Sequence, residues 1–226
     1  MLRCATGTGT VRFVTVITVL LLAATAARGQ LADFDSLAEG FYPTVTSGGV
    51  TFTNLDDFTP ITTSDSFAID DAVPDLNGIS GYSAPNVLGF NALGPGQGVI
   101  FSRLGSFDFS TGAQASAASL FFIAFDNAPG STLEIQGLLG GNVVNSASVP
   151  LNTQFQIVSH ALTLGPGTYD AFKVVAHGTT QNGAVFGVID NVSVTPIPEP
   201  GALGACFAIV TLGLRRRARG VRSTGG

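Results

Sequence analysis

The chain of 226 residues has no tryptophan, one methionine and two cysteines, and only 11% of its residues are charged. This low charge, together with a hydrophobic content of 45%, excludes a charge-rich disordered chain. Because Cys4 and Cys206 lie near the two ends, residues 30–195 hold neither disulfides nor thiolate metal ligands. The sequence has instead 29 glycines, 11 prolines and 17 phenylalanines, a composition typical of short strands joined by tight turns.

Basic residues are also scarce in the middle of the chain. Of the ten Lys and Arg, only Arg103 and Lys173 lie between residues 30 and 195, whereas all fifteen Asp and Glu fall between Asp33 and Glu199. Residues 33–199 therefore carry thirteen more acidic than basic residues. Such an excess of negative charge repels nucleic acid, so we expect no nucleic-acid partner.

The first 29 residues have the order of a secretory signal peptide. Arg3 and Arg12 precede an apolar run, and small residues follow it. Residues 24–26 (ATA) and 27–29 (ARG) both fit the small-x-small pattern, so we expect cleavage between residues 26 and 29. A retained N-terminal anchor is the alternative.

The C-terminal segment reads as a temporary membrane anchor. Its apolar run, Gly201 to Leu214, has fourteen residues and would span about 21 Å as a helix, less than the hydrocarbon thickness of about 30 Å. The prolines at 196, 198 and 200 favour an extended, protease-accessible backbone before it. Four arginines after the run would stay on the cytoplasmic side: Arg215, Arg216, Arg217 and Arg219. A permanently tail-anchored protein is the alternative.

The order PIPEP, apolar segment and arginine cluster resembles the PEP-CTERM sorting signal of exported bacterial proteins. The resemblance implies that residues 196–226 are the signal, and that Pro198, Glu199 and Pro200 are recognised by exosortase, a membrane protease that removes the tail. It also implies export through the secretion machinery of a Gram-negative bacterium. The protein would be inserted transiently in the inner membrane with its body in the periplasm, and would end at the cell surface or outside the cell.

Residues 30–195 alternate short apolar stretches with turn signals. In the segment TLEIQ, Leu133 and Ile135 are expected on one face of a strand, with Glu134 and Gln136 on the other. No long run has the helical period, so we predict an all-β, antiparallel sandwich of the jelly-roll type, flanked by a signal helix and a short C-terminal hydrophobic helix. The expected strands are 49–55, 86–90, 98–104, 106–110, 118–125, 132–139, 142–149, 154–164, 168–177 and 184–195.

The stretches ADFDSL, SGGVTFTN and VIDNVSV also resemble the jelly-roll bodies found ahead of PEP-CTERM tails, which are similar to galactose-binding-like and carbohydrate-binding modules. The resemblance implies a sandwich fold and makes exopolysaccharide a candidate partner. Aromatic platforms for sugars are scarce, because the chain has only three tyrosines besides its phenylalanines. Tyr82, in NGISGYSAPN, is the best exposed candidate, with packing of the loop as the alternative.

Asp190 stands out in the last expected strand. Four apolar residues are expected to share one face there: Phe186, Val188, Val192 and Val194. Asp190 falls in the same register, where a carboxylate needs a partner, a metal ion or a β-bulge. Because the first and last strands of a jelly roll are often neighbours, Asp33 or Asp35 is expected near Asp190. A structural Ca²⁺ held by Asp33, Asp35 and Asp190 is one interpretation, and a bulge at Asp190–Asn191 is the other.

Residues 56–81 concentrate further carboxylates and resemble a calcium loop in composition: Asp56, Asp57, Asp65, Asp70, Asp71 and Asp75. Val73 occupies a position where the calcium-loop pattern requires Asp or Asn. We therefore interpret this segment mainly as a solvated loop.

Catalytic motifs are absent from the sequence. His160 and His177 are the only histidines, no HExxH or GxSxG occurs, and nothing marks a pair of carboxylates for glycoside hydrolysis. We predict that the protein is not an enzyme. The function expected is that of an exported cell-surface or extracellular-matrix protein, with a carbohydrate-binding module for exopolysaccharide as the first alternative and a glycoside hydrolase as the second.

Overall fold

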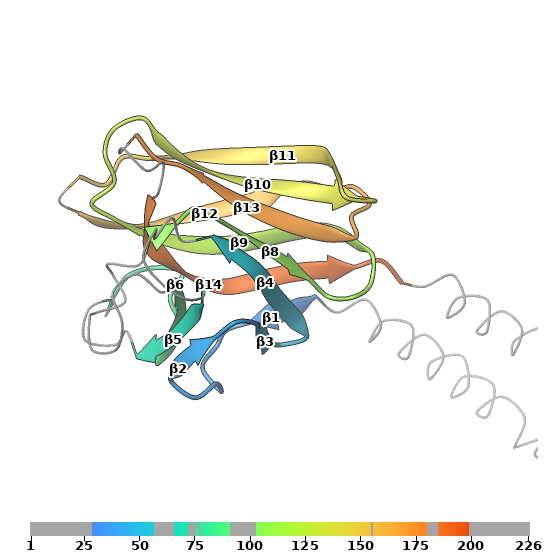
Figure 1. The fold of residues 1–226 in the computed structure, drawn as a ribbon, viewed down its shortest axis with the longest axis horizontal. Coiled ribbons are helices and arrows are strands. Elements are labelled where there is room, and N and C mark those ends of the chain that lie inside the picture. The colour runs from blue at the N-terminus through green and yellow to red at the C-terminus, as the bar shows by residue number, and fades with distance from the viewer. Residues whose placement is uncertain are drawn as a thin grey trace, which may run out of the picture. The chain divides into compact units, whose positions relative to one another are not determined.

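The computed structural model describes residues 29–56, 66–71, 76, 78–90, 103–154, 156–179 and 185–198. These residues form fourteen strands in two antiparallel sheets that pack as a sandwich (Figure 1). The compact unit extends from Gly29 to Pro196. The all-β antiparallel sandwich predicted from the sequence is confirmed, and the two predicted terminal helices lie outside the described residues. Among those residues no helix is long and apolar enough to cross a bilayer.

The first sheet is built around the longest strand, β14. Its hydrogen-bonded order is β12 (Ile157–Leu164), β9 (Ala115–Phe125), β14 (Val185–Pro196), β6 (Asn86–Phe90), β5 (Phe67–Asp71) and β2 (Gly40–Tyr42). Two short strands, β1 (Gln30–Ala32) and β7 (Arg103–Leu104), also pair with β14. The first and last strands of the sandwich are therefore neighbours, as the jelly-roll prediction requires.

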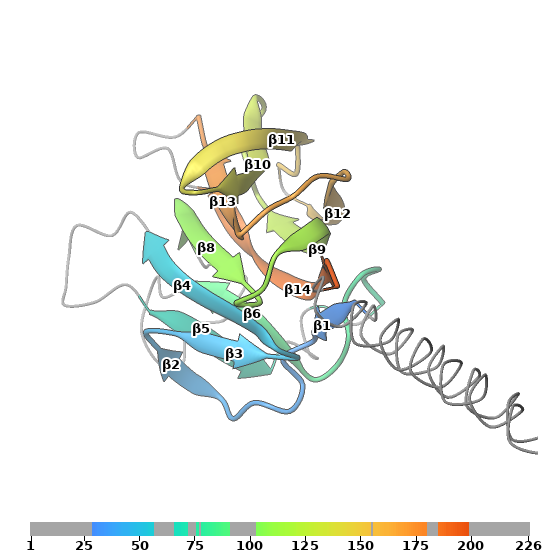
Figure 2. The same cartoon turned by 90° about the vertical axis from the view of Figure 1, so that its right-hand side faces the viewer.

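The second sheet faces the first across the core (Figure 2). Its order is β11 (Asn142–Leu151), β10 (Ser131–Leu139), β13 (Ala171–His177), β8 (Ser106–Ser110), β4 (Val50–Asp56) and β3 (Val45–Ser47). From β8 to β14 the chain passes repeatedly from one sheet to the other, and only β10 and β11 follow each other within a sheet. This crossing places the ends of distant segments side by side.

The alternation expected from the sequence decides which side chains enter the core. Leu133 and Ile135 on β10 are fully buried, whereas Glu134 and Gln136 between and beside them are partly exposed. One face of each strand thus supplies the interior and the other faces solvent, as a half-buried antiparallel sheet requires.

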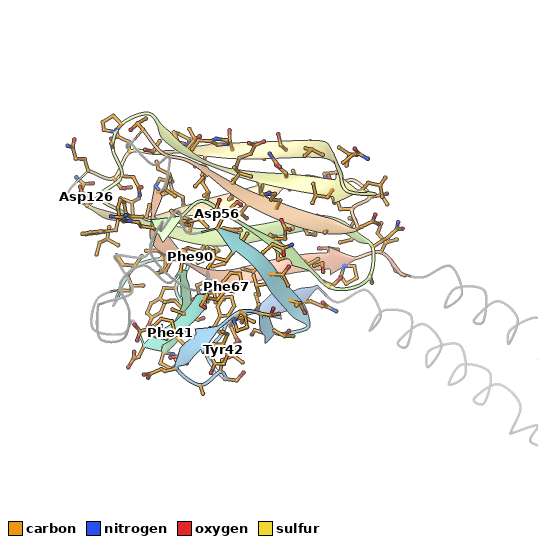
Figure 3. The ribbon with its side chains drawn as sticks, in the orientation of Figure 1. Phe41, Tyr42, Asp56, Phe67, Phe90 and Asp126 are labelled. Atoms are coloured by element: carbon orange, nitrogen blue, oxygen red, sulfur yellow. The ribbon has the colours of Figure 1, made fainter. Side chains whose placement is uncertain are left out.

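The core is rich in phenylalanine, with Phe52 at its centre. The ring of Phe52 lies 5.3–6.4 Å, between centroids, from four other rings: Phe34, Phe67, Phe107 and Phe109. Phe67 and Phe90, which are opposite each other on β5 and β6, also point into the interior (Figure 3). Offset and tilted ring contacts of this kind add about 0.5–1.5 kcal/mol per pair beyond the burial of their area.

Tyr169 closes one end of the sandwich and explains two glycines. Its hydroxyl donates a hydrogen bond to the Gly165 carbonyl oxygen at 2.9 Å and accepts one from Asn145 Nδ2 at 2.9 Å. The ring packs so closely on Gly137 and Gly167 that a Cβ atom at either position would lie within 2.4 Å of it. Only glycine fits there without displacing the buried ring.

Four strands were not expected from the sequence. Three of them, β1, β2 and β3, have three residues each. The fourth, β5, lies within residues 56–81, so the interpretation of that segment as a solvated loop is wrong for Phe67–Asp71, where Phe67 and Ile69 are buried. Of the expected strand 98–104, only residues 103 and 104 are described, and they form β7.

Candidate functional site

A second, smaller apolar cluster lies on the outer face of the first sheet. Its buried members are Leu76, Val87, Ile123 and Val188. Ile79 and Tyr82 pack on them from the segment that precedes β6. Because Ile189 belongs to the main core and Val188 to this outer cluster, successive side chains of β14 enter different cores. The segment around Tyr82 therefore covers the outside of β9 and β14.

β14 contains a β-bulge next to this cover. Its register with β9 shifts between Asp190 and Ser193, and Asn191 has a positive φ of 50°. The bulge that the sequence offered as the second interpretation of Asp190 is thus present. Its extra residue changes which face the following side chains occupy.

The bulge corrects the expected common face of β14. Val188 lies in the outer cluster, but Val192 and Val194 lie in the main core between the sheets. Phe186 is partly exposed, with the Arg103 guanidinium 5.5 Å from the centre of its ring. The prediction that these four apolar residues share one face is wrong, because the pattern was read without the extra residue.

The carboxylate of Asp190 is fully buried and joins the bulge to the covering loop. Its Oδ2 accepts hydrogen bonds from Ser83 N at 2.6 Å and Ser83 Oγ at 3.0 Å, and its Oδ1 accepts one from Asn191 N at 2.7 Å. Asn191 Nδ2 in turn donates to the Gly81 carbonyl oxygen at 2.9 Å. A buried carboxylate needs hydrogen-bond donors. Asp190 receives them from the covering loop and from the bulge.

Burial raises the pKa of Asp190 to about 7. The hydrogen bonds from Ser83 and Asn191 act in the opposite direction, while the nearby negative charge of Asp35 adds to the increase. A carboxyl group in this environment changes its charge near neutral pH rather than near pH 4.

Three carboxylates act on the neighbouring Tyr82. The pKa of Tyr82 is raised by burial and then by three negative charges, those of Asp71, Asp190 and Asp35. The Tyr82 hydroxyl donates to the Pro85 carbonyl oxygen at 3.0 Å. We use the name loop–bulge site for the residues Asp35, Asp71, Tyr82, Ser83, Asp190 and Asn191. Tyr82 thus packs on the outer cluster at this site, as the alternative reading of the sequence expected.

Asp35 is held in place by the strand beside the loop. Its Oδ1 accepts a hydrogen bond from Asn86 N at 3.1 Å, and the buried side chain of Asn86 donates through Nδ2 to the Leu37 carbonyl oxygen at 2.9 Å. The fold therefore brings Asp35 close to Asp190. It does not gather Asp33 with them, because no three Asp, Glu, His or Cys of the described residues are grouped to hold a metal ion.

The hydrogen-bond donors around Asp190 would compete with a calcium ion for its carboxylate. Both oxygens of Asp190 already accept N–H or O–H donors from Ser83 and Asn191. A hard cation there would have to share the carboxylate with those donors and find its other oxygens among Asp35 and backbone carbonyls. Calcium binding stays a prediction, although both carboxylate oxygens of Asp190 have hydrogen-bond partners without a cation.

The other residues singled out from the sequence are dispersed. Asp56 ends β4, whereas Asp70 and Asp71 end β5. Pro198 is described directly after β14, but Glu199, Pro200 and the arginine cluster at 215–219 lie outside the described residues, as do Asp57, Asp65 and Asp75. The two histidines are on different sheets: His160 is on β12, and His177 on β13 contacts Glu134 with Nε2 3.0 Å from Oε2.

A row of polar side chains crosses the outer face of the second sheet, and sequence reasoning did not find it. Cross-strand pairing aligns its five members: Ser146, Gln136, Lys173, Asp108 and Thr53. Asp108 Oδ2 accepts a hydrogen bond from Asn54 Nδ2 at 2.7 Å, while its buried Oδ1 has no partner among the described residues. We call this row the polar face; it presents donors and acceptors but no aromatic ring.

Comparisons with known proteins found only distant likenesses. No family model matches the chain, and no curated protein matches it in sequence. Several solved structures resemble it at low identity. The enzymatically active domain of tailspike protein 4 from bacteriophage CBA120 is 11% identical, with a TM-score of 0.26, over 75% of this chain and 19% of that one.

Two more of these structures are carbohydrate-binding modules. TmCBM61, solved with β-1,4-galactotriose, is 15% identical over 62% of this chain and 91% of its own, with a TM-score of 0.33. The module CBM6cm-2 of Cellvibrio mixtus lichenase 5A, solved with cellotriose, is 12% identical over 74% and 96%, with a TM-score of 0.28. Every one of these TM-scores is below 0.5, so the likenesses define neither the fold nor the function of this chain.

Proposed function

We propose that the protein is a non-enzymatic, exported β-sandwich protein of the cell surface or extracellular matrix, delivered through its C-terminal sorting signal. The observation that carries the proposal is the order of three features at the C-terminus: PIPEP, an apolar segment too short for a comfortable permanent span, and four arginines. An anchor of this kind suits a protein that is held at the membrane only until exosortase cuts it.

The boundaries of the sandwich support this assignment. β14 ends at Pro196, directly before the sorting motif, and β1 begins at Gln30, directly after the expected signal peptide. Removal of residues 1–29 and of the tail beyond the motif would therefore take no strand from either sheet. A body that is complete between two processing sites can fold before, during or after both cuts.

The test is a pair of glutamate substitutions in the native host. Glu199→Ala removes the charged residue of the motif, and Glu39→Ala removes an exposed glutamate of the body as a matched control. We expect the wild-type protein and the control to lose their C-terminal segment, and Glu199→Ala to stay in the membrane fraction with its tail intact. Normal processing of Glu199→Ala would refute the assignment of the motif.

Binding of exopolysaccharide is a second candidate, favoured by the polar face. Its side chains stand in one row across five strands and offer hydrogen-bond donors and acceptors to a chain of sugar hydroxyls. Lys173 lies at the middle of the row, so Lys173→Ala would weaken binding to the host polysaccharide in a pull-down. Asn152→Ala, an exposed residue beyond the end of β11, serves as the control. Equal binding of both variants would remove this candidate.

A further inference from the structure

Both ends of the sandwich leave it at the same place, which we call the exit pole. Gln30, at the start of β1, is paired with Val194, and Pro196, at the end of β14, is paired with Ala115 (Figures 1 and 2). Under the proposed function, the signal peptide and the sorting tail would both extend from this pole. If either the signal peptide or the sorting tail is inserted in the membrane, the exit pole is the end of the body from which the inserted segment departs.

The turn between β10 and β11 belongs to the exit pole. Tyr169 exchanges two backbone hydrogen bonds with Ala115, at 2.8 and 2.9 Å, and Ala115 is the partner of Pro196. The next residue, Asp170, donates its N–H to the Leu138 carbonyl oxygen at 2.8 Å and accepts the Gly140 N–H at 2.8 Å through Oδ2. This chain of contacts fixes the turn to the strand end from which the tail departs.

The turn is preformed and apolar. Leu139 pairs with Asn142 across a two-residue loop, Gly140 and Gly141, whose φ angles are 57° and 78°. Positive φ at both positions matches the right-handed twist of a hairpin, so the loop needs no rearrangement to present its neighbours. We call residues 138–144 the hairpin tip.

The hairpin tip gathers exposed apolar side chains. Of the five large hydrophobic side chains that are exposed among the described residues, three lie here: Leu139 at 38%, Val143 at 54% and Val144 at 53%. They lie within six residues of one hairpin rather than scattered singly, and exposed apolar side chains gathered in this way mark a contact surface.

The exit pole is also nearly free of charge in a protein whose body is strongly acidic. No Asp, Glu, Lys or Arg occurs in the segments that meet there, which are residues 29–32, 111–118, 138–145, 163–169 and 191–198. The nearest carboxylate is Asp170, and its two oxygens accept hydrogen bonds from Gly140 N and from Gln114 Nε2 at 3.2 Å. The electrostatic repulsion that keeps the body away from anionic lipid is therefore weakest at this pole.

We propose that the exit pole rests on the membrane surface while the tail is threaded, with Leu139, Val143 and Val144 of the hairpin tip in the interfacial layer. The proposal rests on the proposed function, because it requires residues 201–214 to be in the inner membrane. Only four residues lie between Pro196 and Gly201, so the five steps from one residue to the next, at about 3.4 Å each, span at most about 17 Å. The pole cannot move far from the bilayer, and docking it would hold the sorting motif at the membrane surface where a membrane protease acts.

The test uses the full-length chain with one fluorescent label. Cys4→Ser and Cys206→Ser remove the native thiols, and Val143→Cys then places an environment-sensitive nitrobenzoxadiazole group on the hairpin tip. Asn152→Cys, just beyond the other end of β11, is the matched control. Both proteins are reconstituted into vesicles of phosphatidylethanolamine and phosphatidylglycerol. We expect a blue shift, a several-fold rise in emission and protection from iodide for the label at 143, and none of these at 152.

The outcomes separate this proposal from the one on which it rests. If the protein floats with the vesicles but the label at 143 behaves as in water, docking of the exit pole is refuted and the sorting proposal stands. If the protein does not float with the vesicles, the tail does not insert and both proposals fail. If unlabelled Val143→Cys chains, treated with a mild oxidant such as copper phenanthroline, become joined to each other by a disulfide at low protein-to-lipid ratio, a second copy covers the tip and membrane docking is refuted.

A second variant checks the same contact without a label. Val143→Asp with Val144→Asp places two charges on side chains that are already exposed, so the thermal midpoint measured by circular dichroism is expected to stay near that of the wild type. Processing of the tail in the native host is expected to slow several-fold. An unchanged processing rate with an unchanged midpoint would contradict a role for the hairpin tip in docking.

Discussion

The buried carboxylate of Asp190 makes the stability of the protein depend on pH. A single substitution that removes this titrating group tests the effect. The pKa of Asp190 is raised by burial from an ordinary value of 3.8 to about 7 in the folded state. Folding therefore favours the protonated form. The contribution of protonated Asp190 to the free energy of unfolding is fully present below about pH 4 and is lost as the pH rises through 7. A difference of about three pKa units corresponds to at most about 4 kcal/mol.

Asp190→Asn keeps the size of the side chain but cannot lose a proton. The free energy of unfolding of the wild type should fall by up to about 4 kcal/mol relative to the variant between pH 4 and pH 8. The variant also has a pH-independent cost of about 1–3 kcal/mol, because an amide cannot accept from Ser83 N and Asn191 N with both of its atoms. The two stability curves should therefore converge or cross near neutral pH.

Urea unfolding followed by circular dichroism at several pH values measures both curves. Asp170→Asn is the control, because the hydrogen bond from Gly140 N, followed by that from Gln114, lowers the pKa of the exposed Asp170 carboxyl. Its contribution is present above about pH 4 and is lost as the pH falls, the opposite sign to that of Asp190. Parallel pH profiles of the wild type and Asp190→Asn would refute the account of the loop–bulge site.

Three further predictions concern the core, the end of the sandwich and calcium. Phe52→Ala should lower the free energy of unfolding by about 3–5 kcal/mol in urea titrations, and a loss below about 1 kcal/mol would contradict its central place in the aromatic core. Gly137→Ala should cost about 1–3 kcal/mol, because the new Cβ meets the Tyr169 ring, whereas Gly165→Ala, with no atom within 4 Å of its Cβ, should be nearly neutral; equal effects would contradict the packing. Because both carboxylate oxygens of Asp190 have hydrogen-bond partners without a cation, chelation of Ca²⁺ should leave the thermal midpoint unchanged, and a clear decrease would favour the calcium interpretation.

The sequence predicted the sandwich because its long strands bury one face only. In β10, Leu133 and Ile135 alternate with polar residues, so the period of two is visible without any tertiary information. Three-residue strands such as β1 are too short to show a period. β5 was missed because Asp70 and Asp71 at its end resembled the surrounding acidic segment, although Phe67 and Ile69 are buried.

The candidate site was only half predictable for a related reason. Proximity of Asp35 to Asp190 followed from the rule that the first and last strands of a jelly roll are neighbours, and in the structure Asp35 lies near Asp190. Ser83 was missed because it lies 107 residues from its partner Asp190 and no local pattern links them. The glycine at position 81 was the one signal in the sequence. In the structure Gly81 has a φ of 81° and packs on Phe121, and a Cβ atom added to Gly81 would lie 2.2 Å from that ring.

Intact-mass spectrometry of the mature protein from its native host tests the central claim most directly. We predict an N-terminus created by cleavage between residues 26 and 29, and a C-terminus that lacks the apolar segment and the arginine cluster. A chain that still ends at Gly226, in a strain that has an exosortase, would contradict delivery through a removable sorting signal.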